Sequence, residues 1–143
     1  IYGRLKKGLE QMENKICLDT DFLVNFLRNR KEEAEFIKKN ETENELATTY
    51  INLFELYYGA YKSQETENNL KAISLLLNRL NVLNLSEDSA KKAGEILVKL
   101  EKDGKTIDFR DLFIGTIALA NGYSIKTGNI KHFNRIEGLN ISD

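Results

Sequence analysis

Short apolar or β-prone runs alternate along this chain with longer stretches whose apolar residues recur every three or four positions. Such runs suit strands that are buried on both faces of a sheet. We expect strands over residues 16–18, 46–49, 82–85, 123–127 and 139–141. Apolar residues at helical spacing predict helices over residues 22–29, 31–39, 51–61, 65–80, 86–104 and 108–120. This alternation predicts a three-layer α/β/α sandwich with a mostly parallel central sheet of about five strands.

Polar residues interrupt the pattern where the first predicted strand ends. Asp19, Thr20 and Asp21 follow the apolar run over residues 16–18 directly. Ligands of parallel sheets bind in the crevice beyond the carboxyl ends of the strands, so these three residues are candidates for a site. The alternative is structural, because Asp and Thr are good helix N-caps and Asp also suits a first helical turn.

A second group of polar residues lies in the helix predicted over residues 51–61. Asn52, Glu55 and Gly59 are spaced three and four residues apart, so they share one helix face between large apolar residues. Glycine costs a helix interior about 1 kcal/mol relative to alanine, so a glycine one turn from an acid indicates close approach by another group. The alternative is a solvated glutamate beside an unrelated glycine.

The helix predicted over residues 108–120 begins with two acids and continues with mostly apolar side chains. Asp108 is its expected N-cap and Asp111 its third residue, positions that suit helix stability without any ligand. A helix that is apolar on most sides is buried. We therefore expect its N-terminus to lie near the sheet edge, with Asp111 in a crevice.

The last strand before the C-terminal region ends in polar residues as well. Thr127 and Asn129 could hydrogen-bond acids or water at that strand end, or they could simply form the turn. His132 is the only histidine, and it follows in a polar loop that includes a helical turn. We interpret His132 as a solvated side chain rather than as a catalytic base.

Composition narrows the classes of protein. The chain has 143 residues, which suits one domain, and 41% hydrophobic residues argue against a disordered chain. Its net charge of −1 lacks the basic footprint of many nucleic-acid-binding proteins, so such contacts would use local patches. No apolar stretch approaches the roughly 20 residues that span a bilayer. The one cysteine, Cys17, lies in an apolar run, excludes an intrachain disulfide and fits a cytoplasmic protein.

The first residues of the chain stand apart from this pattern. Met12 is the only methionine and comes just before the first predicted strand. We therefore expect residues 1–11 to be a non-native leader and residues 12–143 to form the domain.

In order and spacing, the polar stretches resemble the PIN-domain family, and more narrowly the small VapC-like toxins of prokaryotic toxin–antitoxin pairs. The resemblance covers residues 16–141. It rests on four motifs in the family's order: Leu18-Asp19-Thr20-Asp21, then Glu55-Leu56 with Gly59, then Asp111-Leu112-Phe113-Ile114-Gly115 with Ala118, then Thr127-Gly128-Asn129 with His132-Phe133 and Gly138-Leu139.

The resemblance assigns roles to individual residues. It implies that Asp19, Glu55 and Asp111 are metal-binding acids of the catalytic site. Asn129 matches a fourth catalytic position, which carries Asp or Asn in relatives, and the neutral amide puts a strong second metal site in doubt. The supporting residues are then Thr20, Asp21, Thr127 and Asn52.

These residue types suit the hydrolysis of a phosphodiester. Mg²⁺ and Mn²⁺ prefer carboxylate and water oxygens, and a cluster of acids repels itself unless a cation neutralises it. A bound cation polarises a phosphate oxygen and lowers the pKa of an attacking water. The resemblance therefore implies a Mg²⁺- or Mn²⁺-dependent endoribonuclease acting on single-stranded or loop RNA. Local basic residues could hold the RNA backbone, namely Arg28, Arg30, Lys62, Lys126 and Lys131.

Two other functions stay open from the sequence. The pair Asp19 and Asp21 also matches the Asp-x-Asp of haloacid-dehalogenase-like phosphatases, in which the first Asp is a covalent nucleophile. That mechanism needs a downstream lysine and a further acidic pair, for which Asp108 and Asp111 are a poor match. The second alternative is a PIN scaffold that binds RNA or protein without catalysis.

The resemblance also implies protein partners, because this family commonly forms homodimers and is held inactive by an antitoxin. Six aromatic residues exceed what the predicted core accommodates: Phe22, Phe26, Phe54, Tyr57, Tyr58 and Tyr61. Aromatic residues are enriched at protein interfaces. We expect a homodimer, and a groove near these residues for a helix of a VapB-like antitoxin; the alternative is that all six belong to the core.

Overall fold

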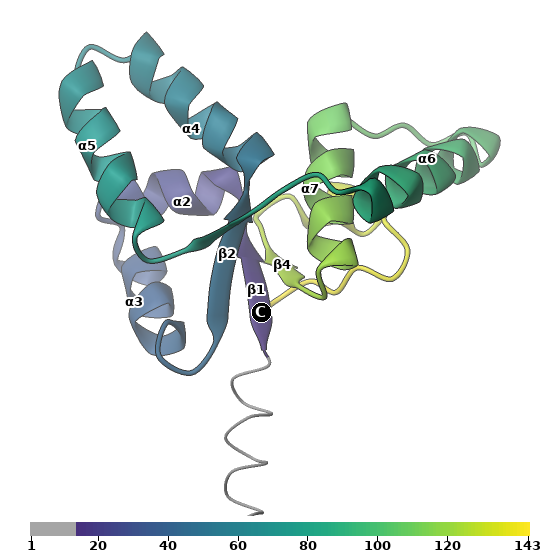
Figure 1. Ribbon diagram of the computed structural model, residues 1–143, viewed down its shortest axis with the longest axis horizontal. Coiled ribbons are helices and arrows are strands. Elements are labelled where there is room, and N and C mark those ends of the chain that lie inside the picture. The colour runs from purple at the N-terminus through teal and green to yellow at the C-terminus, as the bar shows by residue number, and fades with distance from the viewer. Residues whose placement is uncertain (1–13) are drawn as a thin grey trace, which may run out of the picture.

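The computed structural model describes residues 14–143, which form a central parallel sheet between two groups of helices (Figure 1). The strands are β1 (Lys15–Leu18), β2 (Glu45–Thr49), β3 (Asn81–Leu83) and β4 (Ser124–Lys126). The helices are α2 (Thr20–Leu27), α3 (Lys31–Asn40), α4 (Tyr50–Lys62), α5 (Thr66–Leu77), α6 (Glu87–Lys102), α7 (Phe109–Ala120) and α8 (Ile130–Phe133). The predicted α/β/α sandwich is confirmed. The leader expected over residues 1–11, and Met12, lie outside the described residues.

The sheet has the order β3-β2-β1-β4, and its paired strands are parallel. Alternate side chains of a strand face opposite sides of a sheet, and β1 shows this directly. Ile16 and Leu18 pack in the core beneath α2, α3, α4 and α5, whereas Cys17 packs in the core beneath α6 and α7. The order places the carboxyl ends of β1, β2 and β4 side by side.

The expected fifth strand over residues 139–141 is wrong in extent, because the sheet of the described residues has four strands. The chain reverses at Gly138, whose φ is 89°, and Leu139 donates its N–H to the Ile136 carbonyl within that turn. Only the residues that follow run beside β4, where Ile125 pairs with Ile141 in a single parallel bridge. This stretch is too short to form a strand.

The expectation that six aromatic residues exceed the core is correct for half of them. Phe22 is buried and packs edge-on against Phe36, with ring centroids 5.3 Å apart. Phe26 and Tyr57 are partly buried against the same core. The exposed members all lie on α4: Phe54, Tyr58 and Tyr61. Helix α2 packs against both α3 and α4, and Phe36 of α3 covers the ring of Phe22.

Gly115 lies where α7 meets the C-terminal segment, and a Cβ atom there would overlap Cδ1 of the buried Ile136. We expect Gly115→Ala to lower the free energy of unfolding by about 1 kcal/mol, because overpacking of about 1–3 kcal/mol outweighs the gain in helix propensity. The matched control is Gly94→Ala in α6, where a Cβ would meet nothing within 4 Å. That variant should gain up to about 1 kcal/mol in urea unfolding. Equal effects of the two substitutions would contradict this packing.

Candidate active site

Asp19 follows β1 directly, and its carboxylate is held from two sides. Oδ1 accepts the backbone N–H of Thr20 at 2.8 Å, so Asp19 is indeed the N-cap of α2. Oδ2 accepts the hydroxyl of Thr127, at the end of β4, at 2.7 Å. The residue is 7% exposed. Asp19 therefore does both things that the sequence suggested: it caps α2, and it lies at the edge of the sheet.

Asn52 connects Asp19 to the end of β2. It is fully buried in the first turn of α4, where its Oδ1 accepts the hydroxyl and the N–H of Thr49 in a capping box. Its Nδ2 donates to Asp19 Oδ1 at 3.1 Å and to Thr20 Oγ1 at 2.9 Å. The Thr20 hydroxyl in turn donates to Glu55 Oε1 at 2.8 Å. Asn52 and Thr20 thus join Asp19 and Glu55 in one network.

Asp111 reaches the same edge from the third position of α7. Its Oδ2 accepts a hydrogen bond from Nδ2 of Asn129 at 3.3 Å and lies 3.3 Å from Nδ1 of His132. The N–H of Asn129 donates to Thr127 Oγ1 at 2.9 Å, which continues the chain of hydrogen bonds to Asp19. The sequence interpretation missed His132: it places this side chain in solvent, whereas the structure places it against Asp111. Its spacing of three residues from Asn129 on one helical turn was the available signal.

The three acids are electrostatically coupled. Burial raises the pKa of Asp19, Glu55 and Asp111, and it is the largest cause for each of them. The negative charges of Asp19 and Asp111 further raise the pKa of Glu55, and that of Asp19 raises the pKa of Asp111. Hydrogen bonds from Thr20 and Thr127 oppose these shifts, as does the positive charge of Arg110 beside Glu55. The folded protein therefore holds three carboxylates that resist being charged together.

Two residues highlighted by the sequence lie apart from this network. Asp21 is exposed and lines a cavity of about 450 Å³ between α2, α3 and the end of β4. It still raises the pKa of Asp19 through its charge. A Cβ atom on Gly59 would meet nothing within 4 Å, so the close approach expected there does not occur within the described residues. Gly59 instead lines a cavity of about 240 Å³ next to Glu55.

The donor set fits a hard divalent cation in its chemistry. Mg²⁺ and Mn²⁺ take carboxylate oxygens, and their charge removes the repulsion that raises these pKa values. Within residues 14–143, however, no three side chains of His, Cys, Asp or Glu lie grouped closely enough to hold a metal ion. Side chains of this same chain already contact the acids: Arg110 and Thr20 contact Glu55, and His132 contacts Asp111. Binding of a cation would require side-chain movement at these contacts.

Comparisons with known proteins show what this chain is similar to. The PIN domain family model matches residues 16–139. Ribonuclease VapC1 of Haemophilus influenzae strain R2866 is 35% identical over 127 residues, covering 88% of this chain and 95% of that protein. The tRNA(fMet)-specific endonuclease VapC of Shigella flexneri is 30% identical over 129 residues, covering 90% and 97%. The crystal structure of VapBC2 from Rickettsia felis, bound to a DNA fragment from their promoter, matches with a TM-score of 0.84 at 29% identity, covering 90% of this chain and 97% of that one.

The raised pKa of Asp111 predicts a pH-dependent effect of its substitution. A carboxyl group whose pKa is higher in the folded than in the unfolded state binds its proton more tightly when folded, so it destabilises the fold once pH rises above both values. Asp111→Asn removes this penalty. In EDTA, we expect its free energy of unfolding to rise relative to wild type as pH increases from about 4, the ordinary carboxyl pKa. Urea unfolding across acidic to neutral pH measures the difference; a gap that narrows as pH increases would contradict the assignment.

Proposed function

This chain belongs to the PIN-domain family, and from that premise we propose that it is a VapC-like toxin, a metal-dependent endoribonuclease neutralised by a cognate antitoxin. One observation carries the proposal: Asp19, Glu55 and Asp111 are joined by one hydrogen-bond network at the carboxyl edge of the sheet, in a chain that matches VapC ribonucleases over most of its length. The hydroxyls of Thr20 and Thr127 and the buried amide of Asn52 hold the carboxylates in place before a ligand binds. Such preorganised polar groups favour catalysis at a charged site.

Each residue has a definite task in the proposed reaction. Asp19, Glu55 and Asp111 would hold Mg²⁺ or Mn²⁺, and Asn129 would contribute its amide oxygen. When bound, the cation polarises a phosphate oxygen of the RNA and lowers the pKa of the attacking water. Thr127 and Asn52 fix the two oxygens of Asp19, and Thr20 fixes one oxygen of Glu55. The contacts to Asp19 leave that carboxylate little reorganisation at the moment of reaction, whereas Glu55 and Asp111 would shift from their present contacts to bind the cation.

The phosphatase alternative has less support from the geometry. It needs Asp21 as a second carboxylate beside the nucleophile, but Asp21 is exposed and lines the cavity between α2, α3 and the end of β4. It also needs a lysine near Asp19, and no lysine of residues 14–143 lies within ion-pair distance of that carboxylate. Glu55, which hydrogen-bonds Thr20 within the network, would have no role in that reaction.

We expect Asp111→Asn to lower the rate of RNA cleavage by at least about 100-fold while the protein still folds. Asn keeps the shape of Asp but removes a charge that the cation needs, and such electrostatic contributions are worth roughly 10²–10³ in rate. Glu55→Gln should behave likewise. Asn129→Ala should be milder, because a neutral amide binds a cation more weakly than a carboxylate does. His132→Ala should have a small effect, since the ring is not an acid ligand.

Cleavage of a single-stranded RNA at saturating manganese measures this order, with thermal melts as the control for folding. Activity in EDTA equal to that with manganese would contradict metal-assisted hydrolysis. So would an inactive His132→Ala variant alongside an active Asp111→Asn variant. Manganese-independent RNA binding without cleavage by the wild type would instead support the non-catalytic scaffold.

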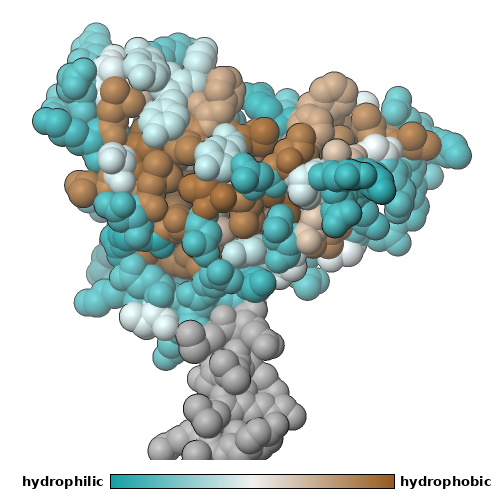
Figure 2. Space-filling model, in the orientation of Figure 1, coloured by the Kyte–Doolittle hydropathy of each residue, from teal (hydrophilic) through white to brown (hydrophobic). Residues whose placement is uncertain are grey.

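The protein surface supports the partner half of the proposal. Tyr50, Phe54, Tyr58 and Tyr61 are exposed on one face of α4, and the rings of Phe54 and Tyr58 stack with centroids 6.3 Å apart. Figure 2 shows hydrophobic residues running across the middle of this view, from the α4–α5 side toward α7, with hydrophilic residues around them. Contiguous exposed apolar patches mark interaction sites. We assign the α4 face to a homodimer contact.

The cavity next to Glu55 suits the antitoxin. It lies between α2, α4 and α5, and its walls are mainly apolar, with Leu27, Leu56 and Ile73 among them. Arg28 and Glu55 also line it, so a segment seated there would lie beside the candidate active site. A VapB-like antitoxin helix with apolar residues on one face would bury them here and block access to the acids.

The dimer assignment predicts a specific change in oligomeric state. Phe54→Glu and Tyr58→Glu should each convert a dimer into a monomer in sedimentation at micromolar concentration, because each places a charge in a desolvated contact. The control is Leu75→Glu on α5, an exposed apolar residue outside this face. A wild type that sediments as a monomer would contradict the homodimer.

A further inference from the structure

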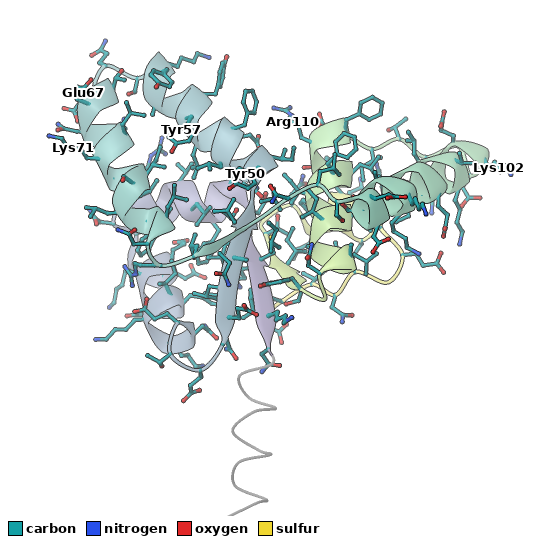
Figure 3. The ribbon with its side chains drawn as sticks, in the orientation of Figure 1. Tyr50, Tyr57, Glu67, Lys71, Lys102 and Arg110 are labelled. Carbon is teal, nitrogen blue, oxygen red and sulfur yellow. The ribbon has the colours of Figure 1, made fainter. Side chains whose placement is uncertain are left out.

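Arg110 places a positive charge at the mouth of the acid cluster. It is the second residue of α7, and its side chain is 59% exposed. Figure 3 shows Arg110 at the N-terminal end of α7, on the side that faces α4. Its Nη1 lies 3.6 Å from Oε2 of Glu55. Among residues 14–143, no lysine and no other arginine lies within ion-pair distance of Asp19, Glu55 or Asp111.

Asp108 fixes the orientation of this guanidinium. Nε and Nη2 of Arg110 lie 3.2 and 3.4 Å from the two carboxylate oxygens of Asp108, which is a two-point contact. Asp108 is itself anchored as the N-cap of α7, where it accepts the N–H of Arg110 at 2.8 Å. Hydrogen bonding to Arg110 lowers the pKa of Asp108, so this carboxylate stays charged. This two-point contact restrains the direction of the Arg110 side chain.

The contact with Glu55 leaves part of the guanidinium available. A separation of 3.6 Å exceeds a normal hydrogen bond, so Nη1 contacts Glu55 through charge alone. Helix stability does not explain the residue either, since a positive charge in the first turn of a helix is opposed by the helix dipole. Arg110 is therefore a charged, oriented and accessible donor next to three acids.

We propose that Arg110 binds a backbone phosphate of the RNA at the edge of the acid cluster, with Asp108 as its positioning residue. The inference rests on the proposed function. An RNA phosphate that approaches three carboxylates is repelled, and the chain's net charge of −1 supplies no general attraction. Arg110 supplies the attraction locally, because a guanidinium matches two phosphate oxygens in a planar fork. A cation held by Glu55 would leave Nη1 of Arg110 free for this contact.

The salt dependence of RNA binding separates this role from a structural one. Each phosphate contact to a single strand contributes about 0.7 to the slope of log K against log salt concentration. In an Asp111→Asn background, which prevents cleavage, Arg110→Gln should reduce the slope by about 0.7 and weaken binding about fivefold at about 0.1 M salt. Arg110→Lys should keep the slope. Asp108→Asn, which preserves the cap, should keep the slope and weaken binding less than Arg110→Gln.

The probe is a fluorescein-labelled single-stranded RNA of mixed sequence, titrated at fixed low manganese concentration across a series of sodium chloride concentrations. The matched control is Arg79→Gln, because Arg79 forms a comparable two-nitrogen contact with Glu41 away from the acids. It should leave the slope unchanged. In the otherwise wild-type enzyme, Arg110→Gln should raise KM more than it lowers kcat.

Three outcomes would overturn the inference. An unchanged slope in Arg110→Gln, or an equal reduction in Arg79→Gln, would overturn the role of Arg110 and leave the proposed function intact. A wild-type protein that neither binds nor cleaves RNA with manganese would overturn both.

Discussion

The arrangement at the carboxyl edge depends on the buried amide of Asn52. Its Oδ1 closes the turn from β2 into α4, and its Nδ2 binds Asp19 at the end of β1 and Thr20 at the start of α2. All polar capacity of this fully buried side chain is thereby used, as an amide removed from water requires. The same hydrogen bonds tie the residues that follow β1 to the end of β2. A local capping requirement therefore becomes the device that aligns Asp19 with Glu55.

The charge of the site works against the stability of the fold. Burial and mutual repulsion raise the pKa of all three acids, so their ionisation opposes folding when no cation is bound. Arg110 and the threonine hydroxyls offset part of this cost. These groups stabilise the charged acids when no cation is bound, and they also keep the carboxylates oriented for binding one. Because the three carboxylates repel one another, a cation that binds them in the folded protein should raise the free energy of unfolding.

The sequence was sufficient for the parts of the site that follow from strand ends. Asp19 and Thr127 end neighbouring strands, and Asn52 and Glu55 share a helix face with fixed spacing, so their approach followed from a parallel sheet. Contacts that depend on side-chain direction were not predictable. Arg110 reads as an ordinary charged residue, and His132 as a solvated one, until the helices that carry them are placed.

The same limit applies to the rest of the fold. The apolar residues of the short C-terminal run predict a strand, but the turn at Gly138 leaves a single bridge. The sequence places Phe22 outside the predicted core, because periodicity alone does not show which neighbouring element covers an aromatic ring. Helix α3 supplies that cover through Phe36, a contact between helices that only the folded structure reveals.

The central claim is that Asp19, Glu55 and Asp111 together hold one divalent cation. Anomalous scattering from crystals soaked in manganese tests it most directly, because the peak locates the metal without reference to activity. We predict one strong peak between these carboxylates, with Glu55 moved away from Arg110. A peak elsewhere, or none at saturating manganese in crystals that bind the metal in solution, would contradict the account.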